Sequence, residues 1–176
     1  HRLEANSGRD QYKLVGAGVG GNKVYDLLFR MEKDVMDQKP DVVVLWVGVN
    51  DVWHKSTFGT GTDFDKFNLF YAALIQRFQK NGIQVYCCTP ACIGEKTDYS
   101  NAQDGDLNEL SKMIRQTAKD NKASLIDFRQ AFLAYNLMHN PTCQSKGVLT
   151  YDGVHLNDAG NRLVAEMMWE NLLKTD

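Results

Sequence analysis

The sequence contains no long apolar run and no excess of charge of either sign. No apolar stretch approaches the roughly 20 residues that a helix needs to cross a bilayer, so we expect no membrane partner. Lys and Arg number 20 against 22 Asp and Glu, and the basic residues are dispersed among the acids. This balance excludes a strong electrostatic nucleic-acid binder. The oligomeric state and the localisation stay open.

Cysteine is scarce and follows no metal-binding pattern. The four are Cys87, Cys88, Cys92 and Cys143, with neither a Cys-x-x-Cys pair nor a Cys/His spacing typical of zinc. We therefore expect no metal, and thiols that are buried or half-buried and behave as small hydrophobes. A disulfide to Cys143 remains an alternative, so the sequence does not decide the redox compartment.

What the sequence does have is an alternation of strand and helix patterns over 176 residues, the length of one domain. This alternation predicts an α/β domain with a mostly parallel sheet. The run 41–47 (DVVVLWV) is apolar on both faces and is expected at the centre of the sheet. Further strands are predicted at 13–15, 83–89 and 124–128. Helices are predicted at 24–35, 65–80, 106–121 and 157–173, and another follows the strand 124–128 and ends at about residue 138. Loops are predicted at 48–62, 94–105 and 140–150.

The first candidate site is the glycine-rich segment 16–21, between a predicted strand and a predicted helix. Its GxGxxG spacing occurs in dinucleotide-binding turns. Those turns also need an acid at the end of the next strand, roughly 20 residues on. Here Asp37 and Asp41 precede that strand and Asp51 comes too late. A tight turn and a backbone N–H site for an anion or oxyanion are the other interpretations, and we favour the last.

The second candidate is Gly48-Val49-Asn50-Asp51, directly after the predicted central strand. A glycine there permits a sharp turn, and the amide of Asn50 can point its donors into a cleft, as oxyanion stabilisation requires. An ordinary Asx turn is the alternative. Gly48, Asp51, Trp53 and His54 are candidate substrate-binding residues, although a solvated loop histidine is the simpler interpretation of His54.

The third candidate is Asp152-Gly153-Val154-His155, just before the last predicted helix. An acid three residues before a histidine can accept a hydrogen bond from the imidazole and leave its other nitrogen to act as a general base. A structural histidine before a helix is the alternative. Asn157 or Asp158 is expected to cap the helix that follows.

Together these segments resemble the SGNH hydrolase superfamily, also called GDSL-type lipases/esterases. The family has four ordered blocks: Gly-Asp-Ser, a glycine after the second strand, Gly-x-Asn-Asp after the third, and Asp-x-x-His before the last helix. The last three are present in order as Gly21, Gly48–Asp51 and Asp152–His155. The resemblance implies a three-layer α/β/α, flavodoxin-like fold and an ester hydrolase that needs no metal or organic cofactor.

The same resemblance assigns roles to individual residues. His155 is the base, Asp152 orients it, and Asn50 and the backbone N–H of Gly21 (rather than Gly20) stabilise the oxyanion. The implied reaction is acyl transfer to water through an acyl-serine. The implied substrates are small acyl esters, carbohydrate acetyl esters among them.

The Gly-Asp-Ser block is absent, so the nucleophile is unknown. Ser7 precedes a predicted strand instead of ending one, and the remaining serines lie in loops or helices or open a strand. In the family's strand order, 2-1-3-4-5, the missing first strand lies between 13–15 and 41–47. Its loss leaves unpaired edges at roughly 1–3 kcal/mol for each unmet buried group. We therefore expect residues 1–176 to be a single domain that is N-terminally incomplete.

Two other functions remain from the sequence. One is a catalytically inactive SGNH-fold binding module, because a base without a nucleophile turns over nothing. The other is a dinucleotide-binding fragment, for which the turn at 16–21 is the evidence.

Overall fold

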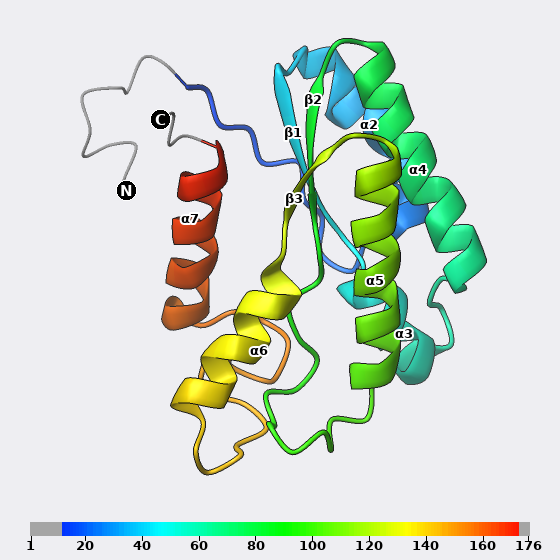
Figure 1. Ribbon diagram of the computed structural model, residues 1–176. Coiled ribbons are helices and arrows are strands. Elements are labelled where there is room, and N and C mark those ends of the chain that lie inside the picture. Colours follow the sequence, from blue (N-terminus) through cyan, green and yellow to red (C-terminus); the bar gives the residue numbers. More distant parts are fainter. Residues whose placement is uncertain (1–11, 173–176) are drawn as a thin grey trace.

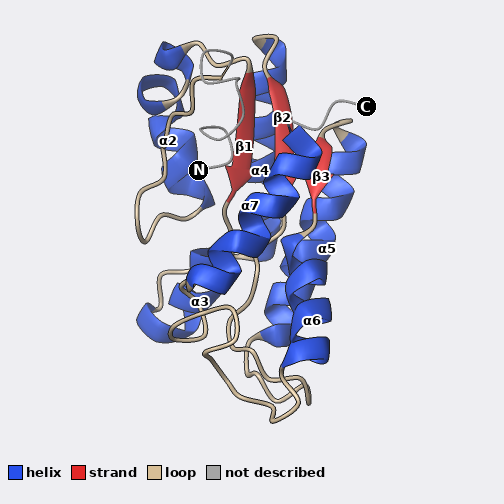
Figure 2. Cartoon of the chain, turned by 90° about the vertical axis from the view of Figure 1, so that its left-hand side faces the viewer, coloured by secondary structure: helices blue, strands red, loops and turns tan. Residues whose placement is uncertain are grey.

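The computed structural model describes residues 12–172, which form three layers (Figure 1). One sheet contains three parallel strands in the order β1-β2-β3: β1 (Val42–Trp46), β2 (Gln84–Cys88) and β3 (Ser124–Ile126). Helices cover both faces (Figure 2): α2 (Val24–Asp34), α4 (Phe64–Lys80) and α5 (Asp104–Asp120) on one, α6 (Phe128–His139) and α7 (Asp158–Leu172) on the other. The α/β fold class predicted from the sequence is confirmed.

The two faces of the sheet take alternate side chains, because successive residues of a strand point to opposite sides. In β1, Val43 and Leu45 pack with α2, α4 and α5, whereas Val44 and Trp46 pack with α6 and α7. This double coverage explains why the run 42–47 is apolar throughout.

The register of the strands brings their carboxyl ends to one edge of the sheet. Trp46 lies opposite Cys88, and Cys88 lies opposite Ile126. The segments that follow the three strands therefore emerge at the same rim, where ligands bind in open parallel sheets.

The strand predicted at 13–15 is wrong, because residues 12–19 have no regular secondary structure and Leu14 is exposed. Within the described residues β1 pairs only with β2, so it is an edge strand rather than the predicted central one. A strand needs a neighbour to satisfy its backbone N–H and C=O groups. Residues 13–15 have no such neighbour in the described chain.

A second prediction is also wrong, since the loop predicted at 48–62 contains the helix α3 (Val49–Phe58). Glycines with positive φ stand at both of its ends, at Gly48 (127°) and Gly59 (68°). Its buried residues, Asp51 and Val52, show that tertiary packing stabilises a segment whose composition is typical of a loop. The other helices agree with the predictions to within a few residues, with a short 3-10 turn, η1 (Met36–Gln38), after α2.

All four cysteines are free thiols, so the alternative of a disulfide to Cys143 is wrong. Cys87, Cys88 and Cys92 are buried. Burial raises the pKa of the Cys87 thiol to about 11, which keeps it protonated and unreactive at neutral pH. Among residues 12–172 there is also no helix with the length and apolarity required to cross a membrane.

The packing of α7 on the loop before it gives a test of the fold. A Cβ at Gly160 meets the carbonyl oxygen of Leu149 at 2.1 Å, whereas a Cβ at Gly105, near the start of α5, meets nothing within 4 Å. We expect Gly160→Ala to lower the free energy of unfolding by about 1–3 kcal/mol, because the backbone must move. Gly105→Ala should raise it by about 0.4–1 kcal/mol. Urea denaturation of both variants checks this, and equal stability of the two contradicts the packing described.

Candidate active site

Asp152 and His155 form a hydrogen-bonded pair in the loop between α6 and α7. Nδ1 of His155 lies 2.7 Å from Oδ2 of Asp152, while Oδ1 of Asp152 accepts the backbone N–H groups of Val154 (2.9 Å) and His155 (2.8 Å). The hydrogen bond from the His155 side chain, followed by that from its backbone, lowers the pKa of Asp152 to about 2. The carboxylate is therefore ionised at neutral pH and fixes the ring, with Nε2 left to exchange protons.

A small hairpin, residues 149–157, presents this pair. Thr150 and Leu156 form an antiparallel bridge, and the N–H of Tyr151 donates to the carbonyl of His155 at 2.8 Å. Gly153 allows the tight reversal through its positive φ of 99°. Asn157 then accepts the N–H of Gly160 at 3.0 Å, which makes Asn157 one of the two caps expected for α7.

The predicted oxyanion donors lie beside each other at the start of α3. Asn50 is in the first turn of that helix, and its Nδ2 donates to the carbonyl of Asn22 at 3.1 Å, leaving the second N–H of the amide for another acceptor. Gly21 adopts a positive φ of 80°. Its backbone N–H donates no hydrogen bond to another residue between 12 and 172.

The aromatic contact between Trp53 and His155 joins these two halves. The ring centroids are 5.8 Å apart in an edge-to-face arrangement at 74°. Trp53 is one helical turn after Asn50, so the Asp152–His155 pair and the predicted oxyanion donors lie on the same rim of the sheet. His54 continues this surface, with its Cε1 3.8 Å from the position of a Cβ on Gly21.

Two of the four predicted substrate-binding residues lie beneath the surface instead. Asp51 is 1% exposed and its Oδ1 accepts the backbone N–H of Val24 at 3.1 Å. Gly48 is buried, and a Cβ there meets Leu110 at 2.9 Å. Burial raises the pKa of Asp51, against the opposing hydrogen bond from Val24. Asp51 thus holds α3 against Val24, and Gly48 packs close to Leu110, so the prediction that these two residues contact substrate is not supported.

Lys23 is a site residue that the sequence did not reveal. It is 8% exposed, and its Nζ donates to the carbonyl of Gly21 at 3.3 Å. Burial first, and the charge of Lys23 second, lower the pKa of His54. No sequence signal marks this lysine, because its role depends on the tertiary packing of the glycine turn.

The dinucleotide interpretation of the segment 16–21 is not supported. The strand that should precede the turn is absent, and the N–H groups at the start of α2 already have partners. The N–H of Lys23 donates to Asp26 at 2.8 Å and that of Val24 to Asp51. Two carboxylates therefore occupy the place where a helix binds a pyrophosphate.

No nucleophile is identified among the described serines. Ser56 donates to the carbonyl of Trp53 and Ser111 to that of Leu107, and no serine between residues 12 and 172 forms a hydrogen bond with His155. Ser7 lies outside the described residues. In the same part of the chain, no group of three or more His, Cys, Asp or Glu side chains is arranged to hold a metal ion.

Comparison with known proteins decides the family. The family model of the GDSL-like Lipase/Acylhydrolase family matches residues 1–163. The chain belongs to this family. One relative is an acetylxylan esterase of Geobacillus stearothermophilus, 26% identical over 158 residues that cover 87% of this chain and 68% of that protein.

Solved structures of the GDSL-like family share the fold closely. The acetyl xylan esterase AlAXEase is 59% identical, with a TM-score of 0.97 over 98% of this chain and 87% of its own. The acetylxylan esterase Axe2 of Geobacillus stearothermophilus is 23% identical, with a TM-score of 0.86 over 98% of this chain and 78% of its own. Catalytic mutants of Axe2 replace a serine, an aspartate and a histidine, the last two being three residues apart in its chain.

Membership of this family makes the chain an ester hydrolase of the serine type with an α/β fold, as the sequence predicted. The family assignment does not test the individual site residues. Their roles are taken up as proposals below.

The Asp152–His155 pair gives a pH test. We expect the Asp152 carboxyl to titrate near pH 2 in a ¹³C NMR experiment, and to titrate closer to its ordinary value of 3.8 in His155→Ala. Because the folded-state pKa is lowered, the pair stabilises the fold above about pH 4, and this contribution is lost as the pH falls through about 2. His139→Ala, which removes a histidine of α6, is the control. An Asp152 titration that is the same in His155→Ala as in the unmodified chain contradicts the pairing.

Proposed function

We propose that this GDSL-like esterase hydrolyses acetyl esters of carbohydrates through an acyl-serine intermediate. The observation that carries the proposal is the contact between Trp53 and His155, because it places the Asp152–His155 pair beside the helix turn that presents Asn50. A base, its orienting carboxylate and amide donors then face one reaction centre.

His155 acts as the general base in this proposal. Its Nδ1 is held by Asp152, so Nε2 accepts the proton of the serine hydroxyl during attack and returns it to the leaving alcohol. Water then enters by the same route, deprotonated by Nε2, and releases acetate. Asp152 keeps the imidazole in the required tautomer and stabilises the imidazolium that forms.

Asn50 and Gly21 bind the oxyanion. The amide of Asn50 is fixed through its bond to Asn22, so its free N–H is preorganised, and the backbone N–H of Gly21 has no acceptor among the described residues. The nearly buried ammonium of Lys23 adds positive charge behind this turn. Donors that are in place before the reaction stabilise the tetrahedral intermediate without reorganisation.

We further propose that the serine is carried by an extended segment that precedes His1 in the full protein. The support is that β1 pairs only with β2 among residues 12–172, together with a cavity of about 840 Å³ between β1, α2 and residues 12–19. The cavity is lined along its length by β1 and reaches Gly48 and Asn50. A strand that paired in parallel with β1 there would end beside the oxyanion donors.

The substrate class follows from the relatives and from the rim. Two relatives of this chain are acetylxylan esterases. Phe58 lies edge-to-face on His54 with 65% of its surface exposed, and Trp53 packs on His155. Aromatic rings beside the base suit the apolar faces of sugar rings.

A catalytically inactive binding module is the second candidate. The observation that favours it is that no serine between residues 12 and 172 forms a hydrogen bond with His155. The fold and the rim are the same for both functions, so covalent chemistry distinguishes them. A fluorophosphonate probe labels the serine of an esterase and leaves a binding module unmodified.

The full protein provides the test of the esterase. We expect it to hydrolyse p-nitrophenyl acetate and to release acetate from acetylated xylo-oligosaccharides. His155→Ala should abolish turnover, while His139→Ala should leave it unchanged. If the full protein neither hydrolyses these esters nor is labelled by the fluorophosphonate probe, the esterase proposal is refuted in favour of the binding module.

The oxyanion assignment has its own test. Asn50→Ala should lower kcat on p-nitrophenyl acetate by about 10²–10³-fold, with a smaller effect on KM, because the lost bond is made mainly in the transition state. Asn68→Ala, at a polar contact of α4 with Thr117, is the control. If Asn50→Ala raises KM and leaves kcat unchanged, Asn50 binds substrate and does not stabilise the oxyanion.

A further inference from the structure

A buried carboxylate, Glu95, lies behind the hairpin 149–157. It belongs to the loop between β2 and α5 and is 1% exposed. Its Oε1 accepts the backbone N–H of Leu149 at 2.6 Å, and its Oε2 accepts that of Val148 at 2.8 Å. Among residues 12–172 no lysine or arginine pairs with it. Because an isolated buried charge is costly, these two charge-assisted bonds hold Glu95 and the segment 148–149 together.

The backbone around Glu95 faces the same region. The N–H of Glu95 donates to the carbonyl of Ser145 at 3.0 Å, and its carbonyl accepts Nδ2 of Asn140 at 2.8 Å. The N–H of Gly94 donates to the carbonyl of Gly153 at 2.8 Å, inside the hairpin itself. Residues 94–95 therefore hold the α6–α7 loop at its start, at the base of the hairpin and at its tip.

The base of the hairpin is the point from which Asp152 and His155 are presented. Leu149 donates to Glu95 through its N–H and accepts the N–H of Asn157 at 3.0 Å through its carbonyl. It therefore connects the carboxylate to the capping residue of α7. A shift of Leu149 moves both ends of the hairpin.

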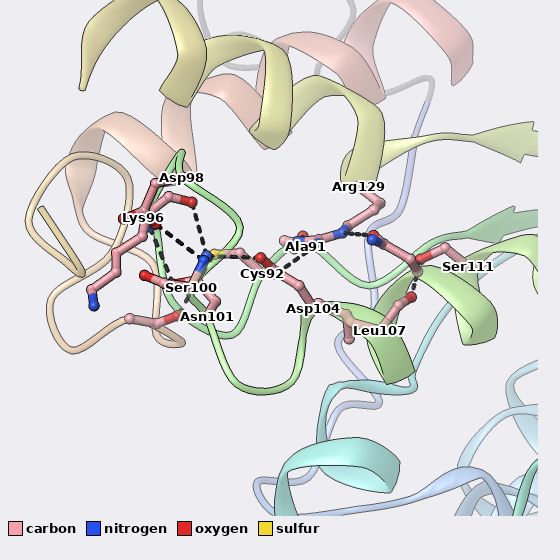
Figure 3. A network of polar contacts seen from close by, with 12 residues as sticks. Ala91, Cys92, Lys96, Asp98, Ser100, Asn101, Asp104, Leu107, Ser111 and Arg129 are labelled. Atoms are coloured by element: carbon pink, nitrogen blue, oxygen red, sulfur yellow. Dashed lines mark hydrogen bonds and ion pairs between the residues drawn. The ribbon is translucent and has the colours of Figure 1, made fainter. Parts of the chain in front are cut away.

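The loop that carries Glu95 is itself firmly held, as Figure 3 shows. Arg129, 2% exposed, donates to Asp104 at 2.7 Å and to the carbonyl of Ala91 at 3.3 Å. Asn101 bonds to Asp104 and to both backbone groups of Lys96. These bonds fix the loop on both sides of Glu95, so the carboxylate is a rigid support.

We propose that Glu95 is a positioning residue of the esterase. It holds the hairpin 149–157 in the position in which Asp152 bonds to His155 and the His155 ring packs on Trp53. The proposal rests on the proposed function, since positioning matters to catalysis only if His155 is the base. Glu95 itself does not reach the substrate, because it is 1% exposed and both of its carboxylate oxygens accept backbone N–H groups.

The test is Glu95→Gln, read by NMR on the chain of 176 residues. Val148 and Leu149 donate to different oxygens of Glu95, and in glutamine one of these two positions becomes an NH2 group, which cannot accept from the N–H that faces it. We expect amide hydrogen exchange at one or both of these residues to accelerate at least about tenfold. We also expect the Asp152 titration to rise from about 2 toward 3.8, because its bonds to His155 loosen.

Asp127→Asn is the matched control. It also converts a well-bonded carboxylate into an amide, and Asp127 accepts from Arg115, Thr89 and Gln130 without touching the hairpin. This variant should loosen the start of α6 and leave the Asp152 titration unchanged. If Glu95→Gln does not fold, Glu95→Asp replaces it, because aspartate keeps the charge on a shorter side chain. In Glu95→Asp the titration of Asp152 should lie between those of the unmodified chain and of Glu95→Gln.

Two outcomes overturn the proposal. One is faster exchange at Val148 and Leu149 with an unchanged Asp152 titration, in whichever Glu95 variant folds. The other is an equal change of that titration in Asp127→Asn.

In the active full protein, Glu95→Gln should lower kcat about 10–100-fold and change KM less than about twofold. If the full protein is inactive but the titration moves, the proposed function fails while the support of the hairpin by Glu95 stands.

Discussion

The parallel pairing of β1, β2 and β3 is the constraint on which the site depends. Parallel strands end at the same edge, so the segments after Trp46, Cys88 and Ile126 must emerge side by side. The helix that carries Asn50 and the loop that carries Glu95 follow directly from two of these strands. The hairpin with Asp152 and His155 then packs against that loop, which brings residues about 100 positions apart in the chain to one rim.

Buried charged groups at this rim act through backbone hydrogen bonds rather than through substrate. Asp51 ties α3 to the start of α2, Glu95 ties the β2–α5 loop to the hairpin, and Arg129 ties that loop to α6 through the carbonyl of Ala91. Each bond offsets the cost of removing a charge from water and fixes the geometry of a turn. Asp51 is the least satisfied of the three, since its Oδ2 has no hydrogen-bond partner among residues 12–172 and burial raises its pKa.

One edge of β1 has no partner strand in the part of the chain that the structure describes, and this edge connects the architecture to the proposed chemistry. An apolar edge strand with unpaired N–H and C=O groups is a ready template for another strand. The cavity along it extends from the exposed segment 12–15 to Asn50, so an added strand would complete the sheet and reach the oxyanion donors together. In the function we propose, a strand added along β1 would therefore extend the sheet and bring the nucleophile to the site at the same time.

The sequence by itself determined the alternation of strands and helices, the parallel sheet and the family. The Asp152–His155 pairing could also be predicted, because three residues of separation in a turn bring the two side chains together locally. The sequence could not predict the helix α3, the burial of Asp51, the role of Lys23 or the clamp made by Glu95. Their positions depend on partners 27 to 54 residues away for Asp51 and Glu95, and on packing for α3. Only the tertiary structure decides such contacts, because local propensity contains no information about which distant backbone groups a buried carboxylate will meet.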